Sequence, residues 1–512
     1  MIDRFEKLRP FLVPLVLLFI VIVDTVMVFL SEGTHGGADD VSHYHLARYA
    51  FQNPKFFLNL WGKPFFTALM APFAQLGFHG VRIFNVLAGT ATAYFTYRTA
   101  KLFNISTPII AIFLLISSPL YTVLMISGMT EILFSLVLIL SIFLFFRKNY
   151  IWSAILLSFI PFVRTEGAVI IPLFMIALAW ERQWRALPFL MFGFVFYSIA
   201  GSFYHDDILW IIHKMPYSGN AKDIYGSGEL LHYLHASKYI FGLPLAMLLA
   251  LGLVAWLTEP LVKKEGVKKA WLMQMLVGYL PFFTYFVAHS YVWWKGMGNS
   301  VGMIRVIVAV LPSAVLLASL GWSRILDLMP VQRTIKYVGT GIMALLLAAI
   351  PYTIYRIPVP LEGTQAIVKD ASDWMLQSEY SGAKTYYFNP FFPHFLNTNP
   401  YDSNQNAWFI PDREHPENSV KVGEIVIWDA HFGPNEGRMP LGNLMNNTGF
   451  KLVHLTREHE PFIVLGGYTY EIYFFQRIPT EEAVDNHKIY EAMVEEILAM
   501  GLEPKQSSDN QY

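Results

Sequence analysis

Long apolar blocks are the feature of this 512-residue sequence that most restricts how it can fold. They run for roughly 17 to 25 residues, the length that an α-helix needs to cross about 30 Å of hydrocarbon. A helix makes its backbone hydrogen bonds within itself and can therefore lie in lipid without unpaired polar groups. The sequence predicts a mainly α-helical, polytopic membrane protein. Composition agrees, because 54% of the residues are hydrophobic and 15% are charged.

We predict eleven membrane spans with a cytoplasmic N-terminus, because Lys and Arg gather in alternate turns between the blocks. The first block has no small-residue cleavage pattern and is expected to be retained as a span. The fifth and sixth blocks are short, so 151–180 could instead form a re-entrant hairpin. The spans are expected at about 8–30, 81–103, 107–127, 129–146, 150–163, 167–180, 186–203, 239–258, 271–291, 301–322 and 337–355.

The composition changes near Pro358, where polar residues begin to separate short apolar runs. The pattern predicts a membrane domain over 1–357 and a small extracytoplasmic α/β domain over 358–512. Within the second domain we expect helices at 364–379 and 440–448 and strands at 384–388, 424–428, 451–455 and 468–475. An amphipathic helix is expected over 479–501, and 506–512 is expected to be disordered.

Charge and cysteine content exclude several classes of function. A formal net charge of -1 without a basic tract gives no sign of nucleic-acid binding. The absence of cysteine excludes disulfides, thiolate nucleophiles and Cys-based metal sites. Since an extracytoplasmic segment without cysteine is more typical of prokaryotes, we expect a prokaryotic inner or plasma membrane.

An acidic pair, Asp39-Asp40, follows the first span on the outer side. Burial or mutual repulsion would raise the pKa of one carboxyl group, which could then act as a general base while its neighbour binds metal or orients substrate. The alternative is structural: either residue could be the N-cap of the helix that runs through Arg48. Spacing alone leaves both open.

Cationic side chains near the outer ends of spans could bind a phosphate group. Arg164, Lys295 and Arg305 are the first candidates, and Arg48 and Lys63 are further ones. For each of them, snorkelling to the lipid headgroups is the alternative.

Other ionisable residues are ambiguous. Asp206 and Asp207 follow the seventh span and could complete a magnesium or manganese site with Asp39 or Asp40, although an interfacial helix stop is favoured. Glu131 and Glu166 lie near span ends, and pairing of Glu166 with Arg164 is favoured over a catalytic role.

The order of the motifs resembles the GT-C superfamily of integral membrane glycosyltransferases, which includes protein mannosyltransferases, aminoarabinose transferases and GPI-type mannosyltransferases. Members carry an acidic pair in the first outer loop, followed by aromatic and basic residues. Here Asp39-Asp40, Tyr44, His45 and Arg48 occupy that place. The resemblance covers about 8–355 and continues through 61–64, 128–131, 164–167 and 302–305.

The resemblance implies a polyprenyl-phosphate-linked sugar donor, an acceptor that we cannot name, and transfer with inversion at the outer face. Asp40 is then the first choice as catalytic carboxylate, with Asp39 beside it. His45, Arg48, Lys63, Arg164, Glu166, Asp206, Asp207, Lys295 and Arg305 are the substrate-binding candidates. Some relatives need a divalent cation and others do not, so a metal held by Asp39, Asp40 and Asp207 stays open. The rivals are a flippase for lipid-linked saccharides and an enzyme like the O-antigen ligases or polymerases.

Overall fold

The structure is a computed structural model that describes residues 2–216, 226–262, 265–298, 300–329, 332–458, 460–479 and 484–499. The predicted disordered end, 506–512, lies outside these residues. Two compact units form: Met1–Gly36 with His43–Pro360, and Gly37–Ser42 with Leu361–Tyr512.

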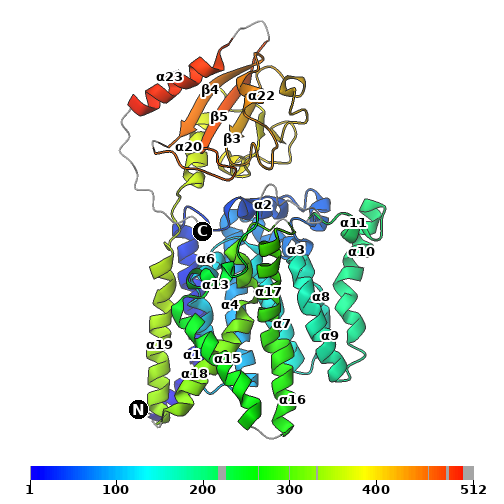
Figure 1. The fold of residues 1–512 in the computed structure, drawn as a ribbon, viewed down its shortest axis with the longest axis vertical. Coiled ribbons are helices and arrows are strands. Elements are labelled where there is room, and N and C mark those ends of the chain that lie inside the picture. The colour runs from blue at the N-terminus through cyan, green and yellow to red at the C-terminus, as the bar shows by residue number, and fades with distance from the viewer. Residues whose placement is uncertain are drawn as a thin grey trace. The chain divides into compact units, whose positions relative to one another are not determined.

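The first unit is helical, and Figure 1 shows its long helices running side by side. Its longer helices are α1 (Ile2–Leu30), α3 (Pro64–Ala74), α4 (Phe78–Leu102), α7 (Thr130–Phe146), α8 (Tyr150–Ser158), α9 (Ile171–Trp180), α10 (Phe192–His205), α15 (Leu243–Val262), α16 (Glu265–Met273), α17 (Leu280–Lys295), α18 (Leu311–Leu328) and α19 (Arg333–Ile354). Shorter ones are α5 (Ile110–Ile116), α6 (Pro119–Met125), α11 (Trp210–His213), α13 (His232–His235) and α14 (Ser237–Phe241). Helix α2 (Gly37–Arg48) carries the predicted acidic pair.

Several of these helices are long and apolar enough to cross a membrane. Among the described residues there are five, or six if one bent pair is a single span: Phe11–Leu30, Leu187–His205, Lys269–Lys295, Ile304–Leu328, Ile335–Ile354, and the pair Pro119–Met125 with Thr130–Phe146. Shorter apolar helices include Tyr150–Phe162 and Thr165–Trp180, where the two short spans were predicted. A mainly helical, multi-pass membrane protein is confirmed. The number eleven stays a prediction.

The span predicted at 107–127 is wrong, because two short helices replace it. Helix α5 ends before Ser117, and Pro119 begins α6 with Ser118 as its N-cap. Proline cannot continue a helix because it lacks a backbone N–H and crowds the preceding turn. After a second break the chain turns by 107° into α7. The Asn85 side chain donates hydrogen bonds of 2.7 and 2.8 Å to the carbonyls of Ser127 and Met129 at this break.

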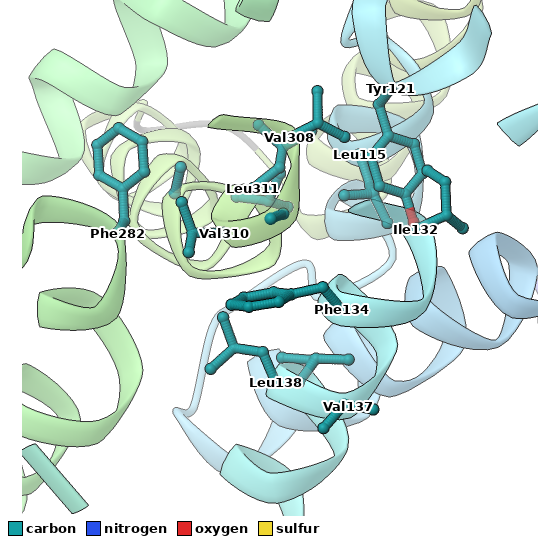
Figure 2. Packing of buried hydrophobic residues seen from close by; sticks show 14 of the residues in the cluster. Leu115, Tyr121, Ile132, Phe134, Val137, Leu138, Phe282, Val308, Val310 and Leu311 are labelled. Atoms are coloured by element: carbon teal, nitrogen blue, oxygen red, sulfur yellow. The ribbon is translucent and has the colours of Figure 1, made fainter. Parts of the chain in front are cut away.

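Helix α7 lies at the centre of the buried core of the first unit. It packs against α4, α8 and the 3₁₀ segment η6 (Ile304–Val310). Figure 2 shows the ring of Phe134 pointing from α7 toward Val310 and Leu311. Apolar packing therefore holds the N-terminal part of α7 against the end of η6, and both elements carry charged residues described below.

The C-terminal end of α1 is held by a buried arginine of α4. Arg82 is 2% exposed and donates hydrogen bonds to the carbonyls of Ser31, at 2.9 Å, and Gly33. The Ser31 hydroxyl also accepts a 2.9 Å hydrogen bond from the backbone N–H of Val359. These contacts satisfy carbonyl groups that the end of a helix leaves without partners, and they fix the chain just before α2.

The second unit contains a mixed five-stranded sheet in the order β2-β1-β3-β5-β4. Its strands are β1 (Thr385–Tyr387), β2 (Asn406–Trp408), β3 (Ile425–Asp429), β4 (Phe450–Arg457) and β5 (Glu471–Arg477), and its helices are α20 (Thr364–Gln377), α21 (Phe391–Phe395), α22 (Gly442–Met445) and α23 (Asn486–Ala499). Strand β1 pairs parallel with β2 and β3, whereas β5 is antiparallel to β3 and β4. The four predicted strands are confirmed. The helix predicted at 440–448 shortens to the four residues of α22, with Asn446 as its C-cap.

Asp429, the last residue of β3, is fully buried. Its Oδ1 atom accepts hydrogen bonds from the backbone N–H groups of His431, at 3.2 Å, and Phe432, at 2.9 Å. Its Oδ2 atom has no hydrogen-bond partner among the described residues. Burial raises the pKa of the Asp429 carboxyl group from 3.8 to about 7, with a smaller contribution from the negative charge of Glu436.

We expect the stability of the second unit to fall as the pH rises from about 4 to about 7, and Asp429→Asn to remove this dependence. The folded state holds the Asp429 proton more tightly than the unfolded chain, so ionisation above the raised pKa costs on the order of 4 kcal/mol. The full-length protein should be heated at pH 5 and at pH 8, with proteolysis reporting when peptides from 361–499 become accessible. The wild type should melt lower at pH 8, whereas the variant should melt at the same temperature at both.

Asp412→Asn is the matched control, because Asp412 is a partly exposed carboxylate whose pKa is lowered by hydrogen bonds from Asn418 and from the backbone of His415. This variant should keep the decrease between pH 5 and pH 8. A wild type with equal melting temperatures at both pH values would contradict the assignment of a buried neutral acid.

Candidate functional site

Five charged side chains from separate segments of the first unit lie close together. We call them the charge cluster: Lys63, Glu131, Arg164, Glu166 and Arg305. Lys63 precedes α3, Glu131 lies in the first turn of α7, Arg164 and Glu166 flank the start of the 3₁₀ segment η3 (Thr165–Ile170), and Arg305 lies in η6. Four of these five were predicted site residues; Glu131 was considered but not chosen.

Arg164 is the most extensively paired member of the cluster. Its Nη1 atom donates to Glu131 Oε1 at 2.7 Å and to Thr130 Oγ1 at 3.2 Å. Its Nη2 atom donates to Glu166 Oε1 at 3.1 Å, which confirms the predicted pairing of Arg164 with Glu166. The Nε atom of Arg164 is buried and has no hydrogen-bond acceptor among the described residues. The buried Tyr285 hydroxyl lies beside this guanidinium group and interacts with it.

Arg305 shares the same carboxylate. Its Nε atom lies 3.6 Å from Glu131 Oε1, and its Nη1 atom donates a 3.2 Å hydrogen bond to the carbonyl of Gly36. Gly36 is the residue immediately before α2. The arginine therefore connects the charge cluster to the segment that follows α1.

Lys63 combines burial with an unusual backbone conformation. The residue is 6% exposed, and its φ of 64° lies in the left-handed region that residues other than glycine seldom adopt. Its Nζ atom donates a 3.2 Å hydrogen bond to Thr165 Oγ1, beside Arg164 and Glu166. A strained backbone persists only where its surroundings fix it, and such residues concentrate at functional sites.

Two polar residues of α17 extend the site. Tyr285 and His289 are buried, their ring centroids are 4.5 Å apart, and His289 lies within electrostatic range of Glu166 and Arg164. The His289 Nε2 atom has no hydrogen-bond partner within the described part of the chain. Sequence reasoning missed this pair. A tyrosine and a histidine four residues apart in an apolar helix share one face, and that spacing is the signal that could have identified them.

An apolar cavity begins two residues beyond Lys63. Phe65 contributes to its wall and stacks on Phe159 with 4.7 Å between ring centroids. The cavity has a volume of about 380 Å³ and is lined by Phe65, Leu144, Trp152, Ile155, Leu156 and Phe159. Every lining side chain is apolar, so the cavity suits a hydrocarbon chain.

The acidic pair lies inside α2 rather than at its cap. The N-cap of α2 is Gly36, so the N-cap interpretation of Asp39 and Asp40 is wrong. Both carboxylates lie in the first turn, where the partial positive charge of a helix N-terminus stabilises negative groups. Asp40 is fully buried, and Asp39 is half-buried.

The remaining predicted site residues contact local partners. Arg48 donates to the carbonyls of Ala74 and Gln75 at the far end of α3 from Lys63. Lys295 is exposed and lies 3.6 Å from the centre of the Trp294 ring. His45 is buried beside Tyr44, with 5.2 Å between ring centroids.

The second acidic pair forms the helix stop that was favoured from the sequence. Asp206 is the C-cap of α10 with a φ of 51°. Asp207 Oδ2 lies 2.8 Å from His213 Nδ1, and this interaction lowers the pKa of Asp207. Within the described ranges, no group of three or more His, Asp or Glu residues is arranged to hold a metal ion. The geometry therefore adds no support for a site shared by Asp39, Asp40 and Asp207.

Comparisons with known proteins show what the chain resembles. No protein-family model and no curated protein matches the sequence. The solved structure of ArnT from Cupriavidus metallidurans bound to undecaprenyl phosphate matches with a TM-score of 0.58 and 13% identity, over 90% of this chain and 97% of ArnT. ArnT in the apo state matches with a TM-score of 0.60 and 11% identity, over 92% and 98%. Although few residues are identical, this chain shares the fold of ArnT.

Proposed function

We propose that the protein is an inverting glycosyltransferase that moves a sugar from a polyprenyl-phosphate donor to an acceptor at the outer membrane face. The observation that carries this proposal is the charge cluster. Three cations, Lys63, Arg164 and Arg305, lie with two carboxylates, Glu131 and Glu166, in a largely buried place. Cations gathered in this way are the donors that a phosphate group needs.

The cations would stabilise the departing lipid phosphate. Charge-assisted hydrogen bonds to phosphate oxygens are stronger in a poorly hydrated site than in water. Lys63 and Arg164 would supply such donors, and the apolar cavity beside Phe65 would receive part of the polyprenyl chain. The similarly folded ArnT was solved with undecaprenyl phosphate, which supports this donor class.

Asp40 would be the general base. It would accept the proton of an acceptor hydroxyl or amide as that group attacks the anomeric carbon, while the bond from carbon to the lipid phosphate oxygen breaks and the phosphate leaves. Attack from the face opposite the phosphate inverts the configuration.

The orientation follows the basic residues of the sequence. The N-terminus would lie in the cytoplasm, and the unit that contains the sheet would lie outside it.

Asp40→Asn should lower the turnover number at least about 100-fold, because positioned general bases contribute about 10²–10⁴ to rates. Purified full-length protein would receive radiolabelled undecaprenyl-phosphate hexoses or pentoses together with membrane extract, and transfer would be measured. Binding of undecaprenyl phosphate should persist in the variant. The control is Glu32→Gln, an exposed acid in the same outer loop, which should keep wild-type transfer.

A full rate in Asp40→Asn would remove Asp40 from the mechanism. If the wild type transfers none of these sugars but moves lipid-linked saccharides across vesicle membranes, the flippase alternative would replace the proposal.

Lys63→Met should weaken binding of undecaprenyl phosphate about 10-fold or more, since a lost charge-assisted hydrogen bond costs about 1.5–3 kcal/mol. Met preserves the unbranched stem and has the same backbone preferences, so the substitution removes chiefly the ammonium group. Isothermal titration with undecaprenyl phosphate would measure the effect. Lys55→Met, which alters an exposed lysine of the same loop, should bind as the wild type does. Equal affinity of both variants would exclude Lys63 from the phosphate site.

A further inference from the structure

Glu131 holds two arginines with a single carboxylate oxygen. Its Oε1 atom lies 2.7 Å from Arg164 Nη1 and 3.6 Å from Arg305 Nε. Glu131 is fully buried, so both pairs act at low effective dielectric. The two cations come from segments more than a hundred residues apart in the sequence, and this carboxylate is their shared contact.

Two arginines this close would separate without an intervening negative charge. The two nitrogens are no more than about 6 Å apart, a distance at which like charges repel strongly in a desolvated site. Glu166 pairs with Arg164. Glu131 lies against both arginines through one oxygen, so its charge bridges the two guanidinium groups.

Resting on the proposed function, we infer that Glu131 is a positioning residue of the donor-phosphate site. It directs Arg164 and Arg305 toward one leaving phosphate. Glu131 contacts neither the sugar nor the phosphate.

Three possible roles of Glu131 predict different results. A purely electrostatic role predicts tighter phosphate binding in Glu131→Gln, because a negative charge leaves the site. A purely structural role predicts a lower melting temperature with unchanged turnover per folded molecule. A positioning role predicts that Glu131→Gln weakens phosphate binding and slows turnover together. It also predicts that Glu131→Asp, which restores the charge at a similar place, recovers part of both.

The test uses full-length protein in detergent and three single variants, Glu131→Gln, Glu131→Asp and Arg305→Lys. A double variant combines Glu131→Gln with Arg305→Lys. Melting temperatures first establish the folded fraction. We expect Glu131→Gln to lower the turnover number at least 10-fold and to weaken undecaprenyl phosphate binding at least 5-fold. Glu131→Asp should recover a substantial part of both. The double variant should lose no more turnover or affinity than the single variant with the larger loss, because both changes disrupt one contact.

Glu259→Gln is the matched control. Glu259 forms a 3.6 Å ion pair with Arg324, its side chain is 12% exposed, and neither residue belongs to the charge cluster. This variant should retain turnover and binding within twofold. Unchanged turnover in folded Glu131→Gln, tighter phosphate binding, equal losses in the Gln and Asp variants, or additive losses in the double variant would each overturn the inference.

Measuring the binding of undecaprenyl phosphate distinguishes a failure of this inference from a failure of the proposed function. If the wild type binds undecaprenyl phosphate but transfers no sugar, the proposed function fails, and the affinities of the Glu131 variants still decide the positioning role. If the wild type does not bind undecaprenyl phosphate, the phosphate site is absent and both fail.

Discussion

The ion pair between Glu131 and Arg164 joins α7 to the chain between α8 and α9 deep inside a helical unit. Ionised groups are costly in such a place unless their charges and hydrogen bonds are satisfied together. The structure meets this requirement by bringing Glu166, Arg305 and Lys63 to the same place. The positions of several helix ends therefore depend on one another, because moving any of them would leave a charge without its partner.

Broken helices make this arrangement possible. Unbroken spans would carry charged residues at their ends to the membrane surface, where water would separate them. Here Glu131 begins a helix directly after a turn of 107°, and Arg164 precedes a short 3₁₀ segment. Irregular backbone at membrane depth is tolerated where other groups satisfy it, and Asn85 does this for two carbonyls at the turn.

The sequence predicted most elements whose signal is local. Apolar length identified helical segments such as 150–163 and 167–180, and aromatic and β-branched runs identified four strands. Strand β2, Asn406–Trp408, was missed because it lacks the run of β-forming residues that marks β1. The break inside 107–127 was also missed. The Ser118-Pro119 pair is a local signal for the start of a new helix. The prediction followed the continuous hydrophobicity of 107–127 instead.

The candidate site was predictable only in part, because a basic residue near a span end has the same appearance whatever it contacts. Three of the predicted cations converge: Lys63, Arg164 and Arg305. Arg48 instead donates to the end of α3, and the Lys295 ammonium group lies over the Trp294 ring. Three-dimensional packing decides between these outcomes. The same holds for Glu131, whose two partners lie 33 and 174 positions further along the chain.

The turn between α6 and α7 also constrains how this chain can vary. Loops usually tolerate insertions and deletions. One added or lost residue in 126–129 would rotate α7 by about 100° about its axis, since a helix has 3.6 residues per turn. The Glu131 carboxylate would then point into apolar packing, and Asn85 would face the wrong carbonyls. Among homologues, this short turn should keep a constant length even where its residue types differ.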